Sequence, residues 1–358
     1  MRWRVLAFAA IFLMLLEIVL RAGVTPRFPD DFRVPQGTLM GYEEFVGQVA
    51  KTDSVRIAVV GDSINYGIFA HKSDTLSAYL DRIYRPQHRP VDAYNFSMLA
   101  AHPADILPVV SRLTESDAAD LIVVNFDYRF YRGEGVARNY PELYERAPEV
   151  TPPSGLKVAP RTKTFEARAD DWARARWCLY AERDAIVAAV FGERPRKALE
   201  FWGRDVRAKV MHRPAFKKKS KLDLKKLKAS FDVPPLTPDN PDVRFLLASL
   251  DQAKRRGVPV LVYVGPLDRQ ALVKGAALDE AAYAENIACV KRLVEAHGAL
   301  FADYSDFLPS AAISDSHHPL ATGYRAIAAD LAKRLEPVIR ELERGRRARP
   351  LHATKAAS

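Results

Sequence analysis

Cysteine is scarce in this sequence: only Cys178 and Cys289 occur among its 358 residues, and they stand far apart. Zinc sites use cysteine and histidine at short spacings, so no metal site of this kind is expected. In an oxidising compartment the two cysteines can pair, but the sequence does not show whether their geometry permits a disulfide.

Signatures of nucleic-acid recognition are also absent. The formal net charge is +10, and much of the excess comes from two blocks, residues 216–228 and 344–349. Such blocks are most often solvated surface or tail. Anionic lipid headgroups or an acidic polymer are the next interpretation. Nucleic acid ranks third, because no helix-turn-helix, zinc-finger or RNA-recognition motif accompanies the charge. We therefore expect an anionic membrane surface as a partner, and no nucleic acid.

A long apolar run stands at the N-terminus, where residues 5–16 contain no polar side chain and follow a positively charged start. A cleaved signal peptide, a signal anchor and a buried helix of a soluble domain compete as interpretations. The buried helix is disfavoured because prolines follow directly, and no clean small-x-small cleavage site follows the run. The run is short for a membrane helix, but Trp3, Arg4 and Arg21 can reach the interfaces.

We therefore predict an uncleaved anchor over residues 1–24, in which Glu17 and Arg21 can pair on one helix face. The positive-inside rule places Arg2 and Arg4 on the cytoplasmic side. The predicted location is the cytoplasmic (inner) membrane, crossed once, with the catalytic domain facing the periplasm or exterior.

Strand and helix patterns alternate over two parts of the chain, separated by a different pattern. The first part carries apolar runs that predict strands over 57–60, 91–97 and 121–125, with helices between them. The second carries strands over 258–264 and 300–303, with helices over 243–256, 280–296 and 321–341. Such alternation predicts an α/β fold, a parallel sheet with helices on both faces. The predicted division is 1–24 anchor, 25–50 tether, 51–130 first α/β part, 131–239 helical basic-aromatic insertion, 240–342 second α/β part and 343–358 disordered basic tail.

Polar residues follow the predicted strands, at the sheet edge where open α/β folds bind ligands. Ser63 stands in the turn Gly61-Asp62-Ser63, and Asp315 and His318 share one loop before the last helix. A serine becomes a nucleophile when a base takes its proton and an acid orients the base. The alternative for Ser63 is a turn or helix-capping serine. His317 competes with His318, but the three-residue spacing from Asp315 favours His318.

These residues carry a family resemblance. Gly61-Asp-Ser-Ile-Asn-Tyr-Gly67 and Asp315-x-x-His318-Pro319 resemble the first and last blocks of the SGNH (GDSL-type) hydrolase superfamily. The resemblance covers the α/β parts but not residues 130–240. It implies a flavodoxin-like three-layer sandwich, with Ser63 as nucleophile, His318 as base and Asp315 as its partner. No cofactor and no metal are implied.

The middle blocks depart from the family pattern. The second block reads Asn95-Phe-Ser97 instead of Asn-x-Gly, and Ser97 keeps a backbone N–H that can join the Ser63 N–H in the oxyanion hole. The third reads Asn125-Phe-Asp127-Tyr instead of Gly-x-Asn-Asp. An ionised Asp127 would repel an oxyanion. Either Asp127 is protonated, or Asn125 donates instead, or the hole differs from that of ordinary esterases.

These departures and the anchor resemble exported SGNH-like proteins of cell-envelope polymer acylation, including teichoic acid D-alanyl-transfer and alginate and cellulose O-acetylation proteins. The resemblance implies O-acyl transfer from an acyl donor, through a Ser63 acyl-enzyme, to hydroxyls of an envelope polymer or exopolysaccharide, beside a multi-spanning membrane O-acyltransferase. An exported carboxylesterase or deacylase is the alternative. A non-catalytic polymer-binding envelope scaffold is the alternative of another class.

Overall fold

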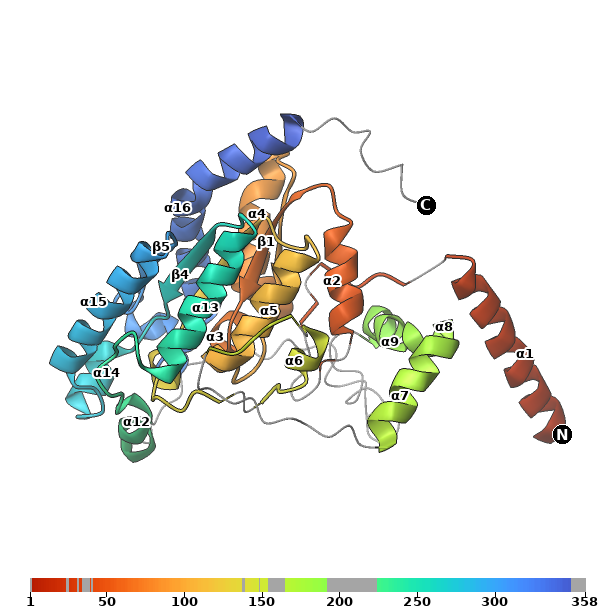
Figure 1. Ribbon diagram of the computed structural model, residues 1–358, viewed down its shortest axis with the longest axis horizontal. Helices are drawn as coiled ribbons and strands as arrows, with labels where there is room; N and C mark the ends of the chain where they lie inside the picture. The colour runs from red at the N-terminus through yellow and green to blue at the C-terminus, as the bar shows by residue number, and fades with distance from the viewer. Residues whose placement is uncertain are drawn as a thin grey trace.

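The computed structural model describes residues 2–23, 26–30, 32–33, 39, 41–136, 139–147, 149–153, 165–191 and 224–348. At its centre lies a five-stranded sheet formed by the described residues, with strand order β2-β1-β3-β4-β5 (Figure 1). All neighbouring strands are parallel. The strands are β1 (Val55–Val60), β2 (Val91–Asn95), β3 (Leu121–Phe126), β4 (Val260–Val264) and β5 (Leu300–Asp303).

This strand order is that of doubly wound flavodoxin-like folds, so the predicted fold class is confirmed. The residues of β1 and β3 are buried throughout, as expected of apolar strands covered on both faces. Alternate side chains of β1 enter different clusters: Ala58 and Val60 on one face, Ile57 and Val59 on the other. The sheet therefore has a helical layer on each side.

Four helices pack on the face of Ala58 and Val60, namely α2 (Tyr42–Ala50), α5 (Pro103–Glu115), α13 (Pro241–Arg255) and α15 (Glu280–Ala296). On the opposite face lie α4 (Leu76–Tyr84) and α16 (Ala321–Ala348). Figure 1 shows α5 and α13 side by side in front of the strands. The remaining elements are α1 (Arg2–Arg21), α3 (Ser63–Tyr66), η1 (Lys72–Asp74), η2 (Arg85–Gln87), η3 (Tyr128–Phe130), α6 (Leu143–Arg146), α7 (Phe165–Arg176), α8 (Cys178–Ala181), α9 (Arg183–Phe191), α12 (Leu224–Phe231), α14 (Arg269–Lys274) and η5 (Ser310–Ala312).

The end of the expected tether is part of the core. Residues 42–50 form α2, and Tyr42, Phe45 and Val49 on it are fully buried. The tether predicted over residues 25–50 is therefore wrong for its last nine residues, which form a buried helix. The same kind of difference occurs at the C-terminus, where α16 continues to Ala348 instead of ending near residue 341. The rest of the tail lies outside the described residues.

The insertion contains shorter helices than its pattern predicts. Within the insertion expected to be helical over 131–239, residues 165–191 form three helices, α7, α8 and α9, with a break at Trp177, whose backbone is extended. Phe201, Trp202 and most of the lysine block lie outside the described residues. Cys178 and Cys289 are free thiols, so the structure does not pair them.

The N-terminal helix α1 is long and apolar enough to cross a membrane, with a mean hydropathy of 2.2 over Trp3–Arg21. Length and composition alone support this, and a signal sequence has the same properties. Glu17 and Arg21 form the expected ion pair at 2.7 Å.

Candidate active site

Ser63 stands at the carboxyl end of β1, at the first position of the short helix α3. Asp62 caps this helix by accepting the Ile64 N–H at 2.8 Å. Gly61 has a φ of +152°, and a Cβ added there would lie 1.6 Å from Asn125 Oδ1. Gly67, with a φ of +79°, ends the helix. The two glycines therefore permit a turn that other residues would strain.

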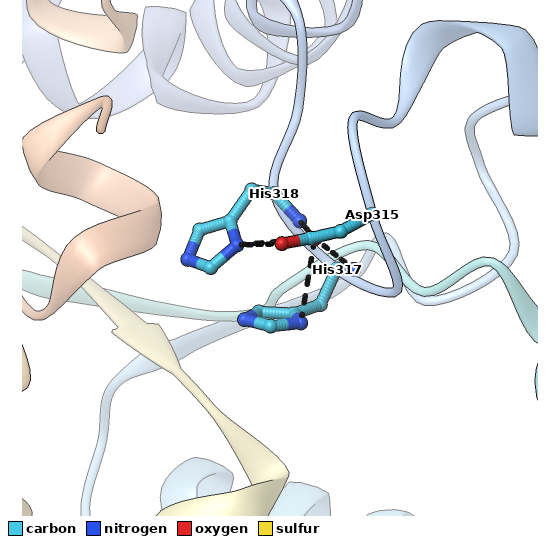
Figure 2. A group of neighbouring side chains, drawn as sticks. All are labelled: Asp315, His317 and His318. Atoms are coloured by element: carbon cyan, nitrogen blue, oxygen red, sulfur yellow. Dashed lines mark hydrogen bonds and ion pairs between the residues drawn. The ribbon is translucent and has the colours of Figure 1, made fainter. Parts of the chain in front are cut away.

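Ser63, His318 and Asp315 form a continuous hydrogen-bonded chain. Ser63 Oγ lies 2.8 Å from His318 Nε2. On the other side of the ring, His318 Nδ1 lies 2.9 Å from Asp315 Oδ2 (Figure 2). This is the geometry in which a histidine takes the serine proton while a carboxylate orients the ring. The structure therefore brings together the three residues that the sequence singled out.

The loop that carries the base is held rigidly. Ser314 N–H donates to the His318 carbonyl at 2.7 Å, and Ile313 bridges Pro319. His318 N–H also donates to Asp315 Oδ1 at 3.1 Å. Burial alone would raise the pKa of Asp315, but the hydrogen bond and charge of His318 hold it well below its usual range. Asp315 is therefore an ionised partner for the imidazolium that forms when His318 accepts a proton.

His317, the competing histidine, packs against the base. Its ring lies on that of His318 with centroids 3.8 Å apart (Figure 2). Its Nδ1 lies 2.7 Å from Ser316 Oγ. Burial, together with the charges of Arg129 and His318, lowers the pKa of His317 well below its usual range. His317 is therefore a neutral ring that supports the base from one side.

The third block is hydrogen-bonded to the nucleophile turn. Asn125 Nδ2 donates to Asp62 Oδ1 at 2.9 Å, and Asp62 N–H donates to Asn125 Oδ1 at 3.1 Å. Asn125 thus braces the nucleophile turn with its amide oxygen and with one of the two N–H donors on Nδ2. Arg129 Nε donates to Asp127 Oδ1 at 3.0 Å, and Nη2 contacts the other oxygen. Burial alone would raise the pKa of Asp127, but Arg129 holds it well below its usual range.

Asp127 is therefore ionised, which contradicts the alternative that it is protonated. The proton belongs instead to Asp62, because burial and the neighbouring Asp127 carboxylate raise its pKa well above its usual range. Asp62 Oδ2 is buried and no donor faces it within the described residues, as expected of an oxygen that carries the proton itself. Sequence reasoning missed Arg129. Its spacing of two residues from Asp127 was the available signal.

The predicted oxyanion donors differ in their availability. Ser97 N–H already donates to Asn95 Oδ1 at 3.0 Å, so the expected second donor is occupied in this structure. Ser63 N–H has no acceptor among the described residues and lies at the first turn of α3. Of the backbone donors that the sequence predicts, the Ser63 N–H is therefore the one that is open to an oxyanion in this structure.

Ligand atoms of Asp315, His317 and His318 lie within 4.8 Å of one another, a spacing that could hold a metal ion. Both ring nitrogens of His318 are already engaged, however, with Ser63 and with Asp315. A metal bound by His318 would have to replace one of these contacts. The closeness of these three residues is therefore explained by the Ser63–His318–Asp315 hydrogen-bonded chain and by the packing of His317 on His318.

No family model and no curated protein matches this chain. Among solved structures, the chain is similar to a lipase/acylhydrolase from Enterococcus faecalis, with 10% identity over 79% of this chain and 96% of that one and a TM-score of 0.40. It is also similar to a GDSL-like lipase from Bacteroides thetaiotaomicron, with 9% identity over 84% and 100% and a TM-score of 0.38. A family two carbohydrate esterase from Clostridium thermocellum matches with 9% identity over 81% and 66% and a TM-score of 0.38. At these scores, the fold assignment depends on the chain's own strand order and site geometry.

Proposed function

We propose that this chain, whose strand order and Ser63–His318–Asp315 chain are those implied by its resemblance to SGNH hydrolases, is a serine acyl-transfer enzyme anchored in a membrane by α1. Its acceptor would be a hydroxyl of an envelope polymer or exopolysaccharide. The single observation that carries the chemistry is the 2.8 Å contact between Ser63 Oγ and His318 Nε2.

The geometry supports a two-step reaction. Ser63 Oγ attacks the carbonyl carbon of an acyl donor while His318 Nε2 takes the hydroxyl proton, and Asp315 stabilises the resulting imidazolium. The developing oxyanion can accept the Ser63 N–H. When the tetrahedral intermediate collapses, His318 returns the proton to the leaving group and the acyl group stays on Ser63. An acceptor hydroxyl then repeats the sequence in reverse and carries the acyl group away.

One feature distinguishes this site from that of ordinary esterases. The ionised Asp127, held by Arg129, replaces the amide expected in the third block of ordinary esterases. An N-terminal anchor would place the enzyme beside its polymer acceptor and beside a multi-spanning membrane O-acyltransferase as a partner.

An exported carboxylesterase is the second candidate, since the same Ser63–His318–Asp315 geometry serves when water is the acceptor. A non-catalytic polymer-binding scaffold has less support, because a scaffold has no use for an aligned serine, histidine and carboxylate.

The proposal can be examined with the full chain in detergent, treated with a fluorophosphonate and then with short acyl esters. We expect a single adduct that maps to Ser63, none in Ser63→Ala, and an unchanged adduct in Ser116→Ala, a serine beyond the far end of α5. Acyl esters plus a hydroxylated polysaccharide should give more polymer-bound acyl than free acid. Release of free acid without polymer-bound acyl would identify an esterase. If the Ser63→Ala variant functioned like the wild type in cells, the non-catalytic scaffold would be the remaining candidate.

A further inference from the structure

The C-terminal end of α1 is fastened to the insertion through Glu17, the acidic residue within an otherwise apolar run. Glu17 accepts the N–H groups of Cys178 at 2.9 Å and Leu179 at 2.6 Å, at the start of α8. Arg21 pairs with Glu17 and also donates to the Arg176 carbonyl at 2.6 Å. These contacts hold the junction of α7 and α8 against the last turn of α1.

The side chains at this junction are unusual for a water-facing surface. Trp172 and Trp177 are 50% and 51% exposed, and their rings meet edge to face with centroids 5.6 Å apart. The Arg176 guanidinium lies 4.8 Å from the centre of the Trp172 ring. Large exposed aromatic side chains beside a cation are characteristic of the membrane–water interface. There the apolar ring contacts lipid, and the polar group of the side chain contacts water.

Neighbouring arginines of the insertion do not share this arrangement. Arg174 is held by Asp170 and Asp184, and Arg183 also contacts Asp170. Arg176, in contrast, has no acidic partner within the described residues and lies on the exposed aromatic pair. Its charge is therefore available to an anion from outside the protein.

The depth of the junction follows from α1. The 19 residues of Trp3–Arg21 span about 28 Å as a helix, close to the roughly 30 Å hydrocarbon core of a bilayer. If α1 crosses the bilayer, Arg21 stands at its far interface. Arg21 contacts the Arg176 carbonyl and Glu17 contacts the Cys178 N–H, so Trp177, which lies between them in the chain, is within about one helical turn of that interface.

We propose that Trp172, Arg176 and Trp177 form an interfacial contact that lies in the phosphate-bearing headgroup layer of the bilayer crossed by α1. This inference rests on the membrane location in the proposed function. The contact would fix the insertion, and with it α2 through the Arg174–Glu44 ion pair, at a set orientation to the membrane surface. Glu17 then joins the anchor to the interfacial contact. Its carboxylate pairs with Arg21 and accepts two backbone N–H groups.

The experiment uses the full chain in vesicles of phosphatidylglycerol and phosphatidylcholine, with bromine atoms placed on the acyl chains just below the headgroups. Trp3→Phe, Trp172→Phe and Trp202→Phe leave Trp177 as the fluorophore. We expect blue-shifted emission, strong quenching by the brominated lipid and weak quenching by aqueous iodide. The control has all four tryptophans replaced by Phe and carries Phe307→Trp, an exposed position after β5 at the sheet edge; iodide but not bromine should quench it.

If the chain resists alkaline carbonate extraction but Trp177 behaves like the Phe307→Trp control, the interfacial contact is refuted and the proposed anchoring stands. If carbonate extracts the wild-type chain, the membrane location itself is wrong, and this inference fails with it. The Glu17→Gln variant should still enter the membrane. The bromine quenching of its Trp177 should fall about twofold, because α1 is then less tightly joined to the junction of α7 and α8. Unchanged quenching would contradict the locking role of Glu17.

Discussion

Arg129 and Asp127 form a buried ion pair beside the nucleophile turn, and burial together with the nearby Asp127 carboxylate raises the pKa of Asp62 well above its usual range. The two carboxyl groups differ because Arg129 binds Asp127 directly, whereas Asp62 forms no ion pair within the described residues. Asp62 also caps α3 and holds Asn125. Arg129 therefore pairs with a carboxylate that lies close to the turn that presents Ser63.

This arrangement predicts strong coupling between Asp127 and Arg129. Arg129→Gln leaves a buried carboxylate without its cation and should lower the free energy of unfolding by about 3–5 kcal/mol. The double variant Asp127→Asn/Arg129→Gln should recover much of that loss, because no buried charge is left unpaired. Urea denaturation of the four proteins of this cycle measures the coupling.

Arg132→Gln, at an exposed neighbouring arginine, is the matched control and should change stability by less than about 0.5 kcal/mol. Additive effects of the Asp127 and Arg129 substitutions would show that the two residues do not act as a unit.

Asp81 makes the stability depend on pH. Burial raises the pKa of Asp81 to about 7, while the unfolded chain titrates near 4. Between these values the unfolded state has lost a proton that the folded state keeps. The stabilisation from neutral Asp81 is therefore fully present below about pH 4 and is lost as pH rises toward 7. The upper bound on this loss is about 4 kcal/mol.

Asp81→Asn keeps the oxygen that accepts the Ala93 N–H, so it should retain the fold and flatten the stability profile between pH 4 and 7. Thermal or urea unfolding at several pH values measures the slope. Asp306→Asn, at a side chain that is 77% exposed, should retain the wild-type slope. A wild-type slope in Asp81→Asn would show that another group carries the dependence.

The two neighbouring histidines should behave differently. His318→Gln removes the base and should reduce Ser63 acylation by at least about 10³-fold. His317→Gln removes only a stacked ring and should reduce acylation by about tenfold or less, with little change in KM. Treatment with EDTA should leave acylation of the wild-type protein unchanged. Loss of acylation on chelation, with restoration by an added divalent ion, would instead favour the metal arrangement of Asp315, His317 and His318.

Gly61 should tolerate no side chain. A Cβ would overlap Asn125 Oδ1 and would also occupy a φ of +152°, so Gly61→Ala should destabilise the fold by more than about 2 kcal/mol. It should also separate Asn125 from Asp62 and slow the labelling of Ser63. Gly345→Ala is the matched control, because a Cβ there meets nothing within 4 Å and a helical alanine is favoured. Equal stability of the two variants would contradict the proposed close packing at Gly61.

Much of the architecture was available from local pattern. The apolar runs that became β1, β3 and β4 are buried strands, and their alternation with helices determines a parallel sheet. The helix α2 was not predicted, because an aromatic and apolar face within the connecting segment 25–50 does not by itself reveal that it packs on the sheet. The breaks between α7, α8 and α9 were missed for a related reason: helical propensity does not specify where tertiary contacts end a helix.

The sequence by itself determined the fold class and the residue types of the candidate site. Ser63, Asp315 and His318 follow a strand or precede a helix in local patterns that can be read along the chain. Only the tertiary structure decided that Asn125 braces Asp62, that Ser97 donates to Asn95, and that Arg129 pairs with Asp127. The physical reason is that a carboxyl group's charge and an amide's availability depend on burial and on neighbours brought from other strands. No local pattern contains that information.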